Sequence, residues 1–347
     1  MSASIYTSEP EITGPVDLCR PGGVLLDPRA RGWSRRPLHR ANLRGRWGRT
    51  KRWDYWAVLT DRWVVALVYA DVDYLGLVEV SWIDLATGRR GGRQAAVPLG
   101  RGVDLPEIPG TEPLRFRGRH LGVDVDDGPD GTRLRATWTE PDHRIGRLDV
   151  TVAAPPGHES LNVVIPWSDR LFQFTSKHQA RPATGVLDAD GQRIGIGGDA
   201  GDAWGVLDVG RGRWPYRTRW NWAGGAGRAG SGAVVGLQMG GRWTVGTGYT
   251  ENGVIVAGEL VKIGEELDWG YDWDRPMAPW RVRGPQSGLD LTLTPRYDRH
   301  VRTNALVLST EVHQVFGRWT GTVPSPGGGR LEVDGILGFA EESRSRW

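Results

Sequence analysis

The sequence of residues 53–85, WDYWAVLTDRWVVALVYADVDYLGLVEVSWIDL, decides the fold class. Residues 53–59 and 63–72 are runs of β-branched and aromatic side chains on either side of the polar turn 60–62. This pattern predicts a strand, a tight turn and a second strand. Residues 76–85 alternate apolar and polar side chains, as a half-buried strand does. The segment therefore predicts the start of an antiparallel meander.

Short runs of the same kind recur along the chain, and none of them has a helical period. They cover residues 134–138, 148–152, 161–166, 233–239, 253–257, 259–263, 289–293 and 305–310. The 51 Gly and 22 Pro supply many turns and few good helix positions. We therefore expect an all-β protein with few or no helices, either barrels or sandwiches. At 347 residues the chain is long for one hydrophobic core, which favours two domains.

Composition and charge argue against several classes of protein. The chain carries 44 Lys and Arg against 41 Asp and Glu, and the basic residues are interleaved with Trp and Gly, so we expect no nucleic-acid partner. The single cysteine, Cys19, excludes an intrachain disulfide. The first residues lack the basic and apolar regions of a secretory signal, and no run approaches the roughly 18 apolar residues of a membrane span. We expect a cytoplasmic protein without a transmembrane segment.

Residues 208–222 combine aromatic rings with fixed positive charge. The candidate ligand-binding residues of this segment are Trp214, Tyr216, Arg217, Arg219, Trp220, Asn221 and Trp222, beside the candidate acid Asp208. Indole faces and guanidinium groups together suit an apolar ligand or a developing cation. A domain junction packed by stacked Arg and Trp explains the same residues equally well.

Residues 247–253 place Tyr249, Glu251 and Asn252 between two predicted strands. A carboxylate beside an amide at the mouth of a barrel would act as an acid or base with an orienting donor. Asn-Gly is also the commonest residue pair of a simple hairpin turn, and the sequence favours that interpretation.

Two further segments carry candidate residues. Lys177 and Arg181 lie in a polar segment, and a desolvated lysine beside other cations would have a lowered pKa, although a surface lysine is the simpler interpretation. His313 and Gln314 follow an apolar run, and His313 would be a proton shuttle or a hydrogen-bonded structural histidine. The other histidines show no ligand spacing along the chain, so we predict no metal site.

Together these segments closely resemble a bacterial family catalogued as domain of unknown function 2804. The resemblance covers residues 33–347 and rests on several separate motifs. They are residues 53–56, Lys177 with 181–185, Asp208 with 210–212, 250–252, 313–317, and 338–341 with 346–347.

More distantly, residues 185–222 are similar to the central motif of a lipocalin-like group. That group includes carotenoid 1,2-hydratases, tocopherol cyclases and fungal pericyclase-type cyclases. Its central Asp is followed by a large residue and Trp-Gly, whereas Val209-Gly210-Arg211-Gly212 follows Asp208 here. The resemblance implies two tandem lipocalin-like antiparallel β-barrels with a ligand cavity at or near their interface.

This organisation divides the chain into three expected parts. They are an N-terminal arm at 1–30, extended on the body or mobile, a first barrel at 31–207 and a second barrel at 208–347.

The resemblance also implies a function on apolar, unsaturated molecules such as isoprenoids or polyketides. The leading hypothesis is a cofactor-free hydratase, dehydratase, isomerase or cyclase, with Asp208 or Glu251 as an acid that apolar burial keeps protonated. Aromatic faces would stabilise a carbocation. Asn221, Asn252 or His313 would orient water. The alternatives are a non-catalytic carrier or sensor of an apolar ligand, and a protein whose Trp and Arg clusters only join two domains.

Overall fold

The structure of the chain is a computed structural model that describes residues 6–305 and 308–346. Over these residues every regular element is a β-strand, apart from two short 3-10 turns, η1 (Pro28–Ala30) and η2 (Gly198–Ala200). The prediction of an all-β fold is therefore confirmed. Three parts of the chain lie outside the described residues. They are residues 1–5 of the predicted arm, residues 306–307 of the predicted 305–310 strand, and Trp347.

Thirteen of the strands in the described part of the chain form the first sheet. They are β2 (Trp33–Ser34), β4 (Thr50–Thr60), β5 (Trp63–Asp71), β6 (Leu75–Asp84), β7 (Arg90–Pro98), β8 (Leu114–Arg117), β9 (Leu121–Gly128), β10 (Gly131–Thr139), β11 (Ile145–Ala153), β12 (Leu161–Pro166), β13 (Phe172–Ala189), β14 (Gln192–Ile196) and β15 (Ala203–Arg213). The main path is β7-β6-β5-β4-β15-β13-β11-β10-β9-β8, while β12 and β14 pair with β13, and β2 pairs with β12.

Nine strands over residues 217–305 and 308–346 form the second sheet. They are β16 (Arg217–Arg228), β17 (Val234–Gly241), β18 (Asn252–Val256), β19 (Glu259–Ile263), β20 (Asp268–Gly270), β21 (Trp280–Gly284), β22 (Leu289–Ala305), β23 (Leu308–Pro324) and β24 (Arg330–Arg346). Their order is β19-β18-β17-β16-β24-β23-β22-β21-β20. A small parallel pair, β1 (Val16–Asp17) with β3 (His39–Arg40), lies apart from both sheets.

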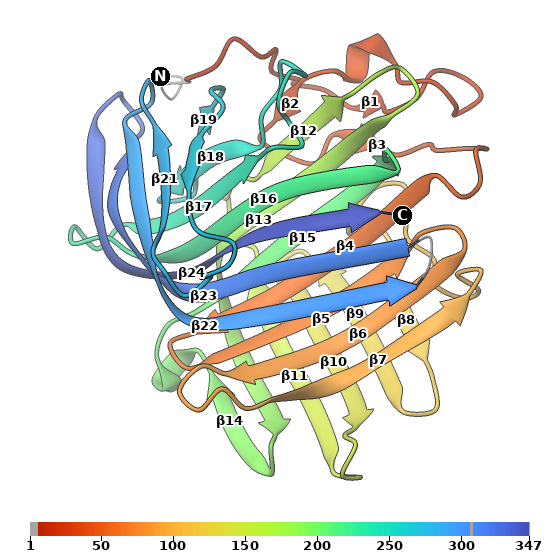
Figure 1. Cartoon of the computed structure of the whole chain (residues 1–347), viewed down its shortest axis with the longest axis vertical. Coiled ribbons are helices and arrows are strands. Elements are labelled where there is room, and N and C mark those ends of the chain that lie inside the picture. Colours follow the sequence, from red (N-terminus) through yellow and green to blue (C-terminus); the bar gives the residue numbers. More distant parts are fainter. Residues whose placement is uncertain (1–5, 306–307, 347) are drawn as a thin grey trace.

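Each sheet curls around a core of its own (Figure 1). The curl of the first sheet brings β5 and β6 against β9, β10 and β11, where the buried residues include Val65, Val80, Val123 and Leu148. The core of the second sheet includes Leu237, Trp280, Leu291 and Trp319. The architecture is two tandem lipocalin-like antiparallel barrels, as the resemblance implies.

A third apolar cluster lies between the two sheets. Side chains alternate along a strand, so Trp56 of β4 faces the first core while Ala57 faces the second sheet. The second sheet meets this surface with Trp222, Phe316 and Phe339. Both faces of β4 and β5 are largely buried, which fits the apolar runs at residues 55–59 and 63–70.

The change from the first sheet to the second occurs between β15 and β16. β15 pairs with β4 and β13 as far as Arg213, so the expected boundary at 207/208 falls inside a strand of the first sheet. Pro215 lies between the two strands and has no N–H to donate to a ladder. The aromatic segment 208–222 therefore contributes to both sheets.

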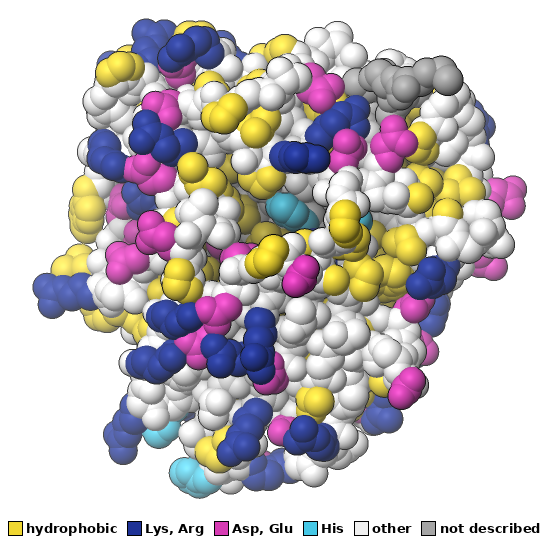
Figure 2. Space-filling model, turned by 180° about the vertical axis from the view of Figure 1, so that it is seen from behind, with side chains coloured by type: hydrophobic (Ala, Val, Ile, Leu, Met, Phe, Trp, Pro, Cys, Tyr) yellow, Lys and Arg dark blue, Asp and Glu magenta, His cyan; other side chains and the backbone are white. Residues whose placement is uncertain are grey.

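The described part of the N-terminal arm lies on the body. Tyr6 forms a parallel bridge with Ile263 of the second sheet, and Glu11 forms one with Trp33 of the first. Basic and acidic side chains are interspersed over the face drawn in Figure 2. Among the described residues, no helix is long and apolar enough to cross a membrane.

Candidate active site

Strand pairing places a buried ion pair between the two sheets. Lys177 of β13 and Asp208 of β15 are directly opposite each other in the antiparallel ladder, and opposite side chains lie on the same face. That face looks toward the second sheet, because the neighbouring Leu207 and Val209 pack in the first core. Lys177 Nζ lies 2.8 Å from Asp208 Oδ1.

The second sheet completes this arrangement. Glu251, just before β18, places its Oε2 3.3 Å from Lys177 Nζ. The ring centroid of Trp222, in β16, lies 4.5 Å from the same ammonium. The side chains of Lys177, Asp208 and Glu251 are each no more than 10% exposed. These four residues, Lys177, Asp208, Trp222 and Glu251, are called the Lys177 centre below.

Indole N–H groups bind both carboxylates of the Lys177 centre. Trp53 Nε1 donates to Asp208 Oδ2 at 3.2 Å, and Trp243 Nε1 donates to Glu251 Oε1 at 2.6 Å. The Thr175 hydroxyl donates to Asp208 Oδ1 at 3.3 Å. Each carboxylate is thus held between Lys177 and an indole.

Two glycines make room for these contacts. A Cβ on Gly210 would lie 2.2 Å from the Trp53 ring, and a Cβ on Gly240 would lie 2.2 Å from Glu251 Cγ. Gly210 belongs to the Gly-Arg-Gly sequence that departs from the usual lipocalin-like motif. The close approach of Trp53 gives this departure a physical reason, because a side chain at 210 would displace the indole that binds Asp208.

Burial and charge set the protonation of the Lys177 centre. Burial raises the pKa of Glu251 to about 7, although Lys177 and the Trp243 N–H oppose the rise. Burial also disfavours the Lys177 ammonium, but Asp208 and Glu251 together hold its pKa above the usual value. A lowered lysine pKa, considered from the sequence, is therefore wrong, because two carboxylates face the amine. Glu251 is thus a buried acid whose pKa lies near neutrality.

Sequence reasoning misses a second buried acid, Glu341 of β24. Its carboxylate accepts the Trp220 indole N–H and the Gln314 amide N–H, each at 2.9 Å. Burial raises the pKa of Glu341 to about 7, and the charges of Lys177 and Asp208 also act on it. The signal that could have found it is the block 338–341, in which a carboxylate ends an otherwise apolar strand segment.

Five tryptophans pack on one another beside the Lys177 centre. This tryptophan cluster consists of Trp53, Trp167, Trp214, Trp220 and Trp243. Trp214 lies at its middle, stacked on Trp243 with ring centroids 5.2 Å apart, and the other three rings lie 5.0 to 5.8 Å from it. Trp53, Trp167 and Trp220 are half-buried, and the half-buried Tyr249 packs against the buried apolar cluster that includes Trp214 and Trp243. The cluster thus connects the Lys177 centre with the surface.

A small void lies between the two sheets near Gln314, the partner of Glu341. It has a volume of about 10 Å³, and its lining includes Tyr55, Gln314 and Phe316. That is room for about one water molecule. A larger hollow of about 380 Å³ lies at the arm, between Pro15 and Ile108. Neither of these two hollows is lined by a residue of the Lys177 centre, whose three charged side chains are no more than 10% exposed.

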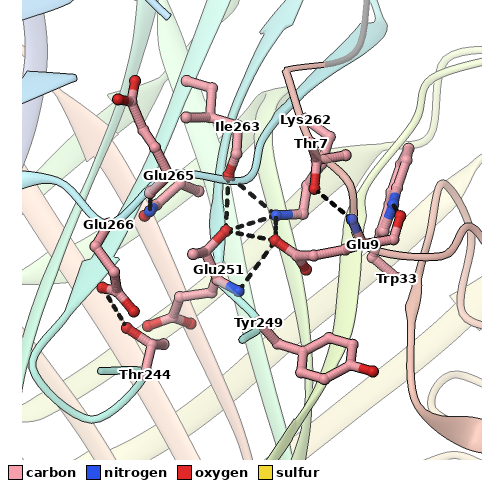
Figure 3. A network of polar contacts seen from close by, with 12 residues as sticks. Thr7, Glu9, Trp33, Thr244, Tyr249, Glu251, Lys262, Ile263, Glu265 and Glu266 are labelled. Atoms are coloured by element: carbon pink, nitrogen blue, oxygen red, sulfur yellow. Dashed lines mark hydrogen bonds and ion pairs between the residues drawn. The ribbon is translucent and has the colours of Figure 1, made fainter. Parts of the chain in front are cut away.

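The N-terminal arm adds a second buried lysine pair near Glu251 (Figure 3). Lys262 Nζ lies 2.8 Å from Glu9 Oε1 and 2.7 Å from the Thr250 hydroxyl oxygen. Glu9 also accepts the Thr250 backbone N–H at 3.2 Å, and its carbonyl accepts the Trp33 indole N–H at 3.1 Å. The arm thus fixes the residue next to Glu251.

Two of the proposed water-orienting residues face away from the Lys177 centre. His313 of β23 binds Asp298. The next residue, Gln314, binds Glu341 and so points to the opposite face of the sheet. Asn221 binds the Tyr271 hydroxyl at 3.1 Å, on the same face of the second sheet as His313. The structure therefore brings Gln314 into the site and keeps His313 and Asn221 out of it, because neighbouring residues of a strand point in opposite directions.

The remaining candidates lie outside the Lys177 centre. Arg181 donates to two backbone carbonyls of the first barrel, and Asn252 binds two backbone groups of the second. Arg219 forms its ion pair with a carboxylate outside the centre. Tyr216 and Arg217 are exposed.

Comparison with known proteins agrees with the fold. A family model described as Domain of unknown function (DUF2804) matches residues 9–347, which confirms the resemblance found from the sequence. No curated protein matches the chain. The crystal structure of kievitone hydratase from Nectria haematococca is similar, with a TM-score of 0.53, 13% sequence identity, and coverage of 86% of this chain and 90% of that one. The crystal structure of CghA with Sch210972 has a TM-score of 0.39 and 12% identity, over 86% of this chain and 88% of that one.

Proposed function

The chain belongs to the family described as Domain of unknown function (DUF2804), and from that premise we propose that its Lys177 centre performs acid catalysis on a hydrophobic, unsaturated small molecule. The reaction class is addition or removal of water, isomerisation or ring closure, without a cofactor. One observation carries the proposal. Glu251 is a buried acid with a pKa of about 7, placed between an ammonium and an indole.

The fold adds modest support. The similar solved structure is that of a hydratase, but shared folds host unrelated chemistries, and 13% identity transfers no residue role. The weight of the proposal therefore rests on the charges and rings around Lys177.

In the first step Glu251 acts as the general acid. With a pKa of about 7, a large share of the group is protonated at neutral pH and still able to release its proton. The Glu251 O–H bond breaks and a C–H bond forms at one alkene carbon, which leaves positive charge on the neighbouring carbon. The indole faces of Trp214 and Trp222 stabilise that charge as they stabilise any cation. Trp222 already lies against one, the Lys177 ammonium.

In the second step Asp208 acts as the base. A water oxygen bonds to the cationic carbon and its proton passes to Asp208, or, in a ring closure, a second alkene attacks and the proton lost from carbon goes there. Lys177 contacts both carboxylates, at 2.8 and 3.3 Å. It therefore returns the proton by donating one to Glu251 and regaining one from Asp208. The cycle begins and ends with the same protonation.

The close packing favours a second candidate function, in which the tryptophan cluster only joins the sheets. The small void of about 10 Å³ between the sheets, near Gln314, and the burial of the Lys177 centre are what a solid junction would show. A carrier of an apolar ligand is a third candidate. Like the catalyst, it would need the tryptophan cluster to open for the ligand, but like the junction it would need no acid.

Deuterium incorporation separates the three functions. The whole chain is incubated in D₂O with a panel of unsaturated isoprenoids and polyketides, and binding and label are both measured by mass spectrometry. Catalysis predicts carbon-bound deuterium that Glu251→Gln lowers by about 10² or more, with binding retained. Glu140→Gln is the matched control, because Glu140 is also buried and accepts two indole N–H bonds, from Trp82 and Trp138, each at 2.7 Å. Binding without label in any compound would support the carrier, and absence of binding would support the junction.

A further inference from the structure

A separate cluster lies on the opposite face of the second sheet from the Lys177 centre. His300 of β22 and His313 of β23 are directly opposite each other in the antiparallel ladder, and Glu311 lies two residues from His313, so the three side chains share one face. One ligand atom of each lies within 4.8 Å of the others. We propose that His300, Glu311 and His313 bind a divalent transition-metal ion of the zinc class.

Asp298 prepares His313 for this role. Asp298 Oδ2 lies 2.8 Å from His313 Nδ1, so a proton on Nδ1 leaves the lone pair of Nε2 available. Metal-binding histidines commonly donate their other ring N–H to a carboxylate in this way. Trp273 packs edge-on against the His313 ring, with centroids 4.5 Å apart, and limits its rotation.

His300 and Glu311 supply the adjustable ligands. His300 Nε2 lies 3.0 Å from Glu311 Oε1, and their side chains are 44% and 32% exposed. The two imidazole rings are stacked, with centroids 4.1 Å apart and planes 7° from parallel. Zinc bonds of about 2.1 Å require ligand atoms about 3.4 Å apart in a tetrahedron, so ligand atoms that lie up to 4.8 Å apart must close by up to about 1.4 Å. Rotation of the partly exposed His300 and Glu311 side chains supplies that movement.

Charge also favours a divalent cation here. Asp298 and Glu311 bring two negative charges, and neutral imidazoles bring none. Arg302 of β22 and Arg344 of β24 are both opposite Glu311 in the ladders. Arg302 is exposed, and the guanidinium of Arg344 lies over the Trp273 ring at 3.7 Å and donates to Glu342 at 2.7 Å. The carboxylate of Glu311 pairs with His300 itself, the neighbouring proposed ligand. Two imidazoles and one carboxylate are a donor set that zinc and similar metals accept.

This site differs from the sequence prediction, which included no metal. Residues 300, 311 and 313 have no ligand spacing along one strand or helix. Only the register between β22 and β23 places His300 opposite His313.

The test is a calorimetric titration of the untagged full chain with ZnCl₂ at neutral pH. One ion is expected per chain, with affinity lowered about 10-fold or more by His313→Gln, by Glu311→Gln and by Asp298→Asn. His143→Gln removes an exposed histidine elsewhere and leaves the affinity unchanged. As a second readout, Co²⁺ bound to the wild-type chain gives visible d–d absorption that excess Zn²⁺ removes. Absence of saturable binding, or binding that His313→Gln and Glu311→Gln leave intact, overturns the proposal and leaves two structural His-carboxylate pairs.

Discussion

Lys177 and Asp208 face each other across two neighbouring antiparallel strands, and their 2.8 Å ion pair lies buried between the two sheets. A buried charge is tolerated only with its partner, because removing one member leaves the other desolvated and unpaired. The residues of the Lys177 centre are therefore expected to affect the stability of the fold as well as to form a candidate catalytic site.

Lys177→Met is expected to lower the free energy of unfolding by about 3–5 kcal/mol, because Asp208 and Glu251 then lose their buried cation. Adding Asp208→Asn should restore part of this loss, which urea denaturation measures. Arg133→Met is the control, since the Arg133–Asp149 pair has both side chains more than half exposed and is expected to contribute less than about 1 kcal/mol. Equal effects of the two single substitutions would contradict a buried ion pair.

Stability should depend on the protonation of Glu251 and Glu341. Burial raises the pKa of each from 4.5 to about 7, so folding favours their protonated forms. Their contribution is fully present below pH 4.5 and is lost as the pH rises through 7. The wild-type stability minus that of Glu251→Gln/Glu341→Gln should therefore fall between these values, by about 1.4 kcal/mol per pH unit for each glutamate.

Subtracting the stability of the double variant from that of the wild type also cancels the effect of His39 and His178 on the pH dependence of stability, which is opposite in sign. Burial lowers the pKa of His39 to about 4 and of His178 to about 3, so they reduce stability as the pH falls below 6.5 in both proteins. A flat difference curve between pH 4.5 and 7 would show that the two glutamates titrate normally.

Trp243→Phe should raise the pKa of Glu251 above 7. The indole N–H stabilises the carboxylate at 2.6 Å, and phenylalanine keeps an aromatic ring while removing that donor. Carboxyl ¹³C chemical shifts measured against pH report the change. Trp220→Phe is the paired control, because its indole binds Glu341 and should move that group's pKa instead. If neither substitution moves its own glutamate, the indoles do not control these acids.

Glu9→Gln should destabilise the chain by about 3–5 kcal/mol, because it leaves Lys262 without its carboxylate in a fully buried position. Glu11→Gln lies in the same arm but breaks a partly exposed pair with Arg35, at 3.1 Å, so it should cost less than about 1 kcal/mol. Guanidinium denaturation of both variants measures the contrast. A small effect of Glu9→Gln would mean that the arm is not docked in solution.

Much of the fold was predictable from local pattern. Apolar runs with polar turns between them, as at 53–59 and 63–72, specify strands because the side-chain period and the turn residues are local properties of the chain. Residue type and context brought the members of the Lys177 centre forward as candidates. Asp208 and Trp222 lie in an Arg- and Trp-rich segment, and Glu251 lies in a polar segment between two predicted strands. Lys177 is one of only three lysines in the sequence. The sequence could not say which face each one occupies.

The sequence by itself therefore determined most of the strands and turns and brought forward all four members of the Lys177 centre as candidates. The tertiary structure alone decided that Lys177 is opposite Asp208, that Glu341 joins them, and that His313 faces His300 instead. In β4 and β15 both faces are buried, so alternation cannot distinguish the first core from the space between the sheets. Register is a long-range property, and a shift of one residue would turn every side chain of a strand to its other face.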